Sequence, residues 1–146
     1  MAVPAVTRRT NRFCFLSLTS LTTSASSTPA KKRITPRIEF KDTTAAIFDG
    51  AKCLFKYYLD IKKYDPTKNK EDITEISVMD YYSKTSIGAL QAFFVIWSDV
   101  YGPMGHEPIP FEKETDAKKF MKEHKGKKIL RFKDVNPNLI KSLDNP

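Results

Sequence analysis

The feature that most restricts the fold of this chain is a short internal repeat. The residues Ala51-Lys-Cys-Leu-Phe-Lys56 match Ala117-Lys-Lys-Phe-Met-Lys122 in the second half of the chain. Each segment has the apolar spacing of an amphipathic helix, and each follows an apolar run that ends in Phe. Each copy therefore predicts a strand–strand–helix–strand unit that is too small to bury its apolar face alone. The repeat predicts an α+β fold with two pseudo-symmetric units.

The apolar periodicity places these units along the chain. The expected strands cover residues 37–41, 45–48, 73–82, 87–90, 92–97 and 128–132, and the expected helices cover residues 50–63 and 113–125. Asp49 is placed to cap the first helix, which Pro66 ends. We therefore expect one α+β domain over residues 34–146, with half-repeats at about 34–82 and 87–135.

A glycine- and proline-rich segment, residues 98–111, separates the apolar run 92–97 from the second helix. Its glycines, Gly102 and Gly105, predict a tight turn that carries Met104, with His106 two residues further on. A thioether beside an imidazole is a donor set suited to a soft metal ion. The alternatives are that Met104 fills the core as an apolar side chain and that His106 is an ordinary exposed loop histidine.

The positive charge of the chain lies mainly in its first residues. The formal net charge is +8, but residues 1–38 hold seven basic side chains and no acidic one. The remaining eighteen basic residues face seventeen acidic residues, so the rest of the chain is almost neutral. We therefore expect no nucleic-acid partner.

Residues 1–33 are expected to form a disordered leader or targeting segment. Nine of the twelve residues from Ser17 to Thr28 are Ser or Thr, a composition that does not build a core. Three explanations remain open: an export signal, an organelle transit peptide, or a start or reading frame that is not the natural one. No stretch approaches the roughly 20 apolar residues that a membrane span requires.

Motifs of catalysis are missing from the sequence. It contains no glycine-rich phosphate loop, no His-Glu-x-x-His helix and no Cys-x-x-Cys redox pair. We therefore predict that the protein is not an enzyme.

Several short motifs occur in an order that carries a family resemblance. They are Asp80-Tyr81-Tyr82, Ala92-Phe-Phe-Val95, Gly102-Pro-Met-Gly105, Ile109-Pro-Phe111 and Gly126-Lys-Lys-Ile-Leu130. Through them the chain resembles the NosL family, accessory proteins of nitrous oxide reductase that bind copper(I) outside the cytoplasm. The resemblance covers residues 34–135 and implies paired strand–strand–helix–strand units, as in the similar fold of organomercurial lyase.

The resemblance also implies a function. It implies a metallochaperone that holds copper(I) at Met104 in the Pro-Met-Gly turn and delivers it to a partner protein. That partner would be nitrous oxide reductase or its assembly machinery, and the place of action would be the periplasm or the outer side of a membrane. The family usually carries a Cys-x-x-Cys-Gly-Met segment before its first strand, where this chain has only Cys14. The alternative function is a metal-free interaction module with the same turn as a docking surface.

His106 and Cys53 are the further candidate copper ligands. Cys53 follows the start of the first helix and has Lys52 and Lys56 beside it, a setting that favours the copper-binding thiolate. The alternative for Cys53 is a half-buried, inert thiol. Nothing in the sequence brings the two cysteines together, so no disulfide is predicted. His124, on the apolar stripe of the second helix, is expected to pack and not to bind metal.

Overall fold

The computed structural model of the protein describes residues 15–20, 35–102 and 105–144. Its strands are β1 (Phe15–Ser20), β2 (Arg37–Phe40), β3 (Thr44–Phe48), β4 (Ile73–Met79), β5 (Ser86–Gly88), β6 (Phe93–Ile96), β7 (Tyr101–Gly102), β8 (Gly105–His106), β9 (Ile109–Phe111) and β10 (Lys128–Arg131). Its helices are α1 (Ala51–Leu59), α2 (Ile61–Tyr64), α3 (Glu114–Glu123) and α4 (Pro137–Asp144), with two short 3-10 turns, η3 (Lys70–Asp72) and η4 (Phe132–Asp134). No described helix is both long and apolar enough to cross a membrane.

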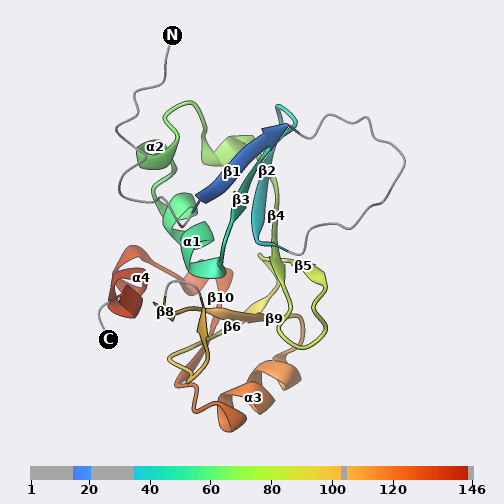
Figure 1. The fold of residues 1–146 in the computed structure, drawn as a ribbon, viewed down its shortest axis with the longest axis vertical. Helices are drawn as coiled ribbons and strands as arrows, with labels where there is room; N and C mark the ends of the chain where they lie inside the picture. Colours follow the sequence, from blue (N-terminus) through green and yellow to red (C-terminus); the bar gives the residue numbers. More distant parts are fainter. Residues whose placement is uncertain (1–14, 21–34, 103–104, 145–146) are drawn as a thin grey trace.

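The described strands form three antiparallel sheets, of which the two larger ones share one arrangement. The first has the order β1-β3-β2-β4-β5 and carries α1, and the second has the order β10-β6-β9 and lies beside α3 (Figure 1). In each sheet the first strand of a unit is central, flanked by the second strand and by the strand after the helix. The structure therefore confirms the α+β fold with two pseudo-symmetric strand–strand–helix–strand units.

The two copies of the six-residue repeat do not occupy equivalent positions in the two structural units. β3 ends at Phe48 and β9 ends at Phe111, and the helix begins three residues later in both units. Ala51 is consequently the first residue of α1, whereas Ala117 is the fourth residue of α3. The equivalence of Ala51 and Ala117 was wrong by three positions. Because three residues are almost one helical turn, both alanines still face the core and both are buried.

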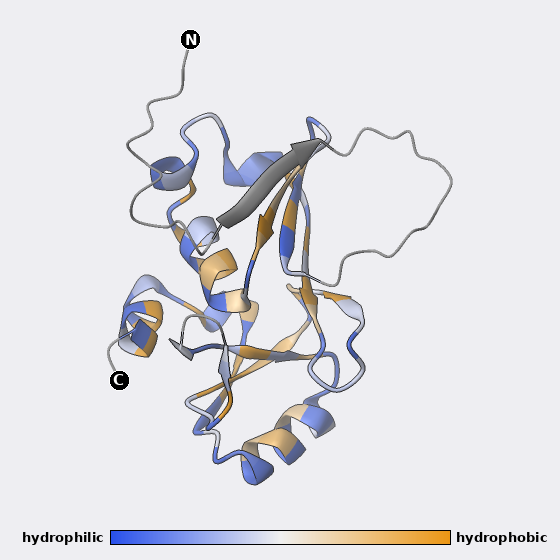
Figure 2. Cartoon of the chain, in the orientation of Figure 1, coloured by the Kyte–Doolittle hydropathy of each residue, from blue (hydrophilic) through white to orange (hydrophobic). Residues whose placement is uncertain are grey.

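The core consists of two clusters, and the second sheet contributes to both. The larger cluster joins the first sheet, α1 and α4 to Phe94, Ile96 and Leu130 of the second sheet. The smaller one lies between β6, β9 and α3 (Figure 2). The smaller cluster is centred on Phe111 and Phe120, whose rings are 5.0 Å apart and fully buried. Each amphipathic helix thus covers an apolar sheet face, which is the arrangement expected from the sequence.

The strand β1 corrects the expectation that residues 1–33 have no ordered structure. Phe15–Ser20 pairs antiparallel with β3 and becomes the edge of the first sheet. Without β1, the outer side of β3 would present unpaired backbone N–H and C=O groups. A short segment rich in Ser and Thr is sufficient to form hydrogen bonds with these groups. The expectations for residues 1–14 and 21–34 lie outside the described residues.

Deleting residues 1–20 is therefore expected to lower the melting temperature by at least about 5 °C, because β3 loses its paired edge. Deleting residues 1–12 alone keeps β1 and serves as the matched control, with little expected change. Both melts are followed by circular dichroism with reductant present, so that cysteine chemistry does not contribute. Equal melting temperatures for the two truncated chains would contradict a stabilising role of β1.

The C-terminal helix α4 was not predicted. The Asn136 side chain accepts a hydrogen bond from the Leu139 N–H at 2.8 Å, and proline occupies the first helical position. This Asn-Pro pair is the signal that would have revealed the helix. Ile140 and Leu143 are buried in the larger core cluster, so α4 closes the open side of α1.

Two charges on α1 bind α4 to it. The Lys52 ammonium, fully buried, lies 2.9 Å from the Asp144 carboxylate, and Lys56 lies 2.7 Å from the same carboxylate. Burial, the largest effect, would raise the pKa of Asp144, but the hydrogen bonds from both lysines outweigh it and lower the pKa. Asp144 is therefore ionised at neutral pH and neutralises charge that α1 carries into the core.

Candidate functional site

The predicted turn around Met104 belongs to a small hairpin. The strands β7 and β8 pair through Tyr101 with His106 and through Gly102 with Gly105. Gly105 has φ +88°, a left-handed conformation that glycine adopts without strain. The residues that join the two strands, Pro103 and Met104, lie outside the described residues. The hairpin nevertheless fixes His106 at a defined position, two residues beyond Met104.

The His106 imidazole packs against two aromatic rings. Its ring centroid lies 5.1 Å from that of Trp97 and 4.7 Å from that of Tyr101. The Nδ1 atom of His106 is buried and makes no hydrogen bond to any part of the chain that the structure describes. Buried polar atoms almost always have partners, so an imidazole nitrogen without one is a candidate ligand atom.

Glu107 connects the hairpin to the start of α1. Its side chain is buried, and its carboxylate lies directly against the Cα atoms of Gly50 and Gly102. A methyl group on either glycine would occupy the space of this carboxylate. Gly50 is the N-cap of α1, whose positive end favours a nearby negative charge. The hairpin is thereby held at the first turn of the helix that carries Cys53.

This arrangement corrects the prediction that Asp49 caps α1. The N-cap is Gly50, and no side chain makes a capping hydrogen bond there. The physical reason is that the approach of Glu107 requires a residue without a side chain at the helix start. The predicted helix 50–63 is also divided, because Asp60 leaves helical geometry and separates α1 from α2.

Cys53 is disulfide-bonded and buried, with an exposed fraction of 2%. The expectations of a half-buried free thiol and of no disulfide were therefore wrong. The sequence contains one other cysteine, Cys14, which lies outside the described residues. The reason for the error is that sequence spacing did not reveal which segments the fold brings together. A disulfide sulfur is not a thiolate, so the role of Cys53 as a metal ligand stays a prediction that requires reduction.

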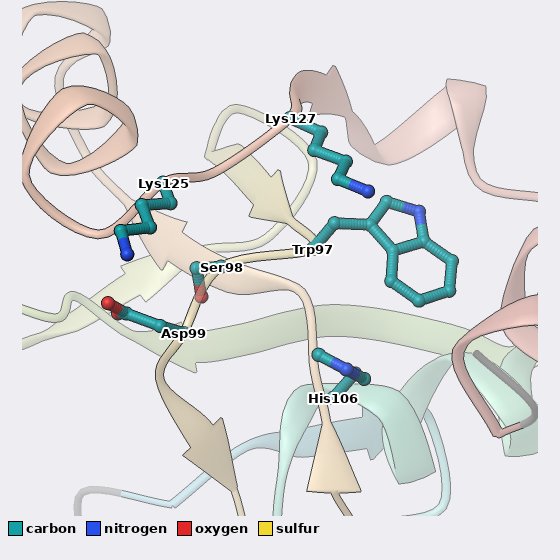
Figure 3. A pocket seen from close by; sticks show the side chains of 6 residues that line it. All are labelled: Trp97, Ser98, Asp99, His106, Lys125 and Lys127. Atoms are coloured by element: carbon teal, nitrogen blue, oxygen red, sulfur yellow. The ribbon is translucent and has the colours of Figure 1, made fainter.

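His106 also lines a cavity of ≈ 450 Å³ beside the hairpin. The other lining residues are Trp97, Ser98, Asp99, Lys125 and Lys127 (Figure 3). Trp97 has φ +61° and Lys125 has φ +57°, left-handed conformations that are costly for side chains of this size.

Backbone and side-chain contacts hold the walls of this cavity in place. The Lys127 N–H donates to the Ile96 carbonyl at 3.0 Å, which ties the cavity wall to β6. His124 behaves as expected for a packing residue, because its ring lies 4.5 Å from that of Phe120 and its Nδ1 lies 2.9 Å from Asp99. Gly126 allows α3 to end close to the sheet, since a methyl group there would meet Val95 and Met121.

Within the described residues, no group of three or more His, Cys, Asp and Glu side chains is arranged to hold a metal ion. Of the predicted site residues, His106 and Cys53 lie on elements that Glu107 joins, and Met104 lies outside the described part. Sequence reasoning missed Glu107, Trp97 and Tyr101. A charged residue is normally exposed, so only the contacts of Glu107 with nearby Gly102 and with Gly50, far away in the chain, would have indicated its burial.

The two sheets, their covering helices and the hairpin define a small α+β protein of the paired-unit class. The NosL family model matches residues 11–140, and the chain belongs to the NosL family. The crystal structure of the copper chaperone NosL from Shewanella denitrificans has the same fold, with a TM-score of 0.60 and 20% sequence identity. That match covers 80% of this chain and 97% of the other. A search of curated proteins found no match.

Proposed function

We propose that this protein binds copper(I) at the β7–β8 hairpin and delivers it to a partner protein, with nitrous oxide reductase or its assembly machinery as the acceptor. Membership of the NosL family supports this proposal, and so does the shared fold of a protein described as a copper chaperone. In this proposal the protein is a copper carrier and not an enzyme.

The observation that carries the proposal is the buried Nδ1 atom of His106. Its Nδ1 is buried without a hydrogen-bond partner among the described residues, on a hairpin whose turn contains Met104. A thioether and an imidazole nitrogen bind a soft, singly charged ion in preference to hard cations such as Mg²⁺. Few ligands leave an open position, so an acceptor can replace them one at a time. Cys53 could add a third soft donor after reduction of its disulfide.

We further propose that the protein acts outside the cytoplasm, in the periplasm or at a membrane surface. The disulfide at Cys53 supports this location, because structural disulfides persist in oxidising compartments. The same bond links delivery to redox state, since reduction would release the thiol next to the hairpin that Glu107 fixes.

Replacing Met104 with Leu is expected to lower the copper(I) affinity by at least about tenfold while the fold stays intact, because Leu conserves volume and apolar character. His106→Ala is expected to weaken binding less, and Cys53→Ser least. The measurement is a competition titration with a coloured copper(I) chelator under reducing conditions.

The matched control is Met121→Leu, the same exchange on α3 away from the hairpin, which should retain wild-type affinity. Thermal melts of all variants separate loss of ligand from loss of fold. If the wild type and Met104→Leu retained copper equally, Met104 would not be a ligand and the copper hypothesis would lose its main residue. If the wild type bound no copper, the metal-free interaction module would be the better description.

A further inference from the structure

The almost neutral charge of the folded part conceals a basic strip. Between residues 118 and 133 the chain holds eight basic residues and a single acid, Glu123. The basic residues are Lys118, Lys119, Lys122, Lys125, Lys127, Lys128, Arg131 and Lys133. Part of this charge is used internally, because Lys118 pairs with Glu114 at 2.9 Å and Arg131 lies over the Phe93 ring.

Lys125 and Lys127 differ from these two, because they line the cavity beside the hairpin. Both side chains are exposed, and neither forms a salt bridge with any described residue. The acid in the cavity wall, Asp99, already has a partner in His124, at 2.9 Å. Two ammonium groups and one carboxylate therefore line the cavity, which leaves a net positive charge there.

The remaining wall of the cavity is aromatic. Trp97 and His106 have ring centroids 5.1 Å apart. Lys127 points toward the Trp97 ring, and Lys125 lies on the side of Asp99 (Figure 3). A ligand that fits must carry negative charge toward Lys125 and Lys127 and an apolar group toward Trp97. An acidic peptide segment with one apolar side chain meets both requirements.

We propose that this cavity docks an acidic segment of the protein that accepts the metal. The inference rests on the proposed function, because His106 belongs both to the hairpin and to the cavity. A segment seated there contacts the residue assigned to copper and brings its own donors within reach of it. The lysines draw the acidic partner in over a distance, and Trp97 holds it once seated.

The structure favours a protein partner over a nucleic acid or an anionic lipid. Exchange of copper(I) requires thioether, thiol or imidazole donors, which a protein supplies and a phospholipid or a thymidine oligonucleotide does not.

Trp97 offers a direct measurement, since it is the only tryptophan in the chain. The probe is a synthetic seven-residue peptide of Asp and Glu around one central Leu, titrated into the full chain while Trp97 emission is recorded. We expect a saturable change that weakens as salt rises from about 0.02 M to about 0.5 M, because the pairing charges are exposed. The double exchange Lys125→Glu and Lys127→Glu should weaken binding at least about tenfold.

The matched control reverses two exposed lysines on α2, Lys62→Glu and Lys63→Glu, at the end of the molecule opposite α3 (Figure 1). This variant should bind the peptide within about twofold of the wild type. Should the charge reversal disturb folding, Lys125→Gln with Lys127→Gln gives the same test with an expected loss of about threefold. Absence of peptide binding, or equal binding by the variants at Lys125 and Lys127, overturns the proposal.

Two further measurements complete the test. A thymidine oligonucleotide or phosphatidylglycerol vesicles that bind more tightly than the peptide, in a manner dependent on Lys125 and Lys127, overturn the assignment to an acidic protein. Copper(I) affinity of the double variant, measured with the chelator, should equal that of the wild type. If the chain bound the peptide through these lysines but bound no copper, the docking proposal would be supported and the proposed copper carrier function would be contradicted.

Discussion

Replacing Asp80 with Ala is expected to lower the free energy of unfolding by about 3–5 kcal/mol, enough to unfold a large fraction of an ordinary domain at physiological temperature. The Asp80 carboxylate, only 2% exposed, accepts hydrogen bonds from the N–H groups of Tyr82, Ser83 and Glu112 and from the Ser83 hydroxyl, at 2.7–3.0 Å. Glu112 lies between β9 and α3. Asp80 therefore ties the end of the first unit to the helix start of the second.

Urea denaturation followed by circular dichroism measures the loss. Asp60→Ala is the matched control, because Asp60 is exposed and makes no capping hydrogen bond, and its expected effect is within about 0.5 kcal/mol. A loss below about 1 kcal/mol for Asp80→Ala would show that the two units are held together elsewhere.

The same carboxylate gives the protein a predictable sensitivity to acid. Burial, the largest effect, would raise the pKa of Asp80, but the donors from Ser83, Glu112 and Tyr82 together outweigh it and hold the pKa below its ordinary value of 3.8. The stabilisation is fully present above pH 3.8 and is lost as the pH falls below that value. The difference in stability between the wild type and Asp80→Asn should therefore shrink below pH 3.8.

The second large effect is expected from a single methyl group. Gly50→Ala places a Cβ atom where the Glu107 carboxylate lies, so the hairpin or α1 must move. We expect a loss of about 2–3 kcal/mol and a fall in melting temperature of about 5–10 °C. The backbone of Gly50 is extended, at φ −156°, a conformation open to any residue. The loss would thus report the contact with Glu107 and not backbone strain.

Gly88→Ala provides the control for the same exchange. A methyl group on Gly88 would meet nothing within 4 Å, so its expected effect is within about 0.5 kcal/mol. Because the hairpin carries His106, Gly50→Ala should also weaken copper(I) binding in the chelator titration. Equal melting temperatures for Gly50→Ala and Gly88→Ala would contradict the close packing of the Glu107 carboxylate against Gly50.

The regular elements of this fold could be predicted because apolar periodicity determines them. The stripes of α1 and α3 and the alternation in β2 are local properties of the sequence, and their positions agree with the structure to within a few residues. β9 was harder to recognise because Pro110 interrupts a strand of three residues. It is tolerated at the sheet edge, where its missing N–H costs no ladder bond.

The contacts that build the candidate site could not be predicted in the same way. The wedge of Glu107 between Gly50 and Gly102, the disulfide at Cys53 and the pairing of β1 with β3 join segments far apart in the chain. No local pattern encodes such contacts. The hairpin could be predicted only in part. Gly102 and Gly105 indicated a turn, but nothing local indicated that the rings of Trp97 and Tyr101 pack against His106.

The two pseudo-symmetric units differ most in how their first two strands are joined. In the first unit, residues 41–43 make a tight turn between β2 and β3, and in the second, residues 97–108 hold the hairpin and the cavity wall between β6 and β9. The longer connection in the second unit leaves the order of its three strands the same as in the first unit. A connection of this kind can therefore change in length and sequence while the strands on either side of it keep their pairing.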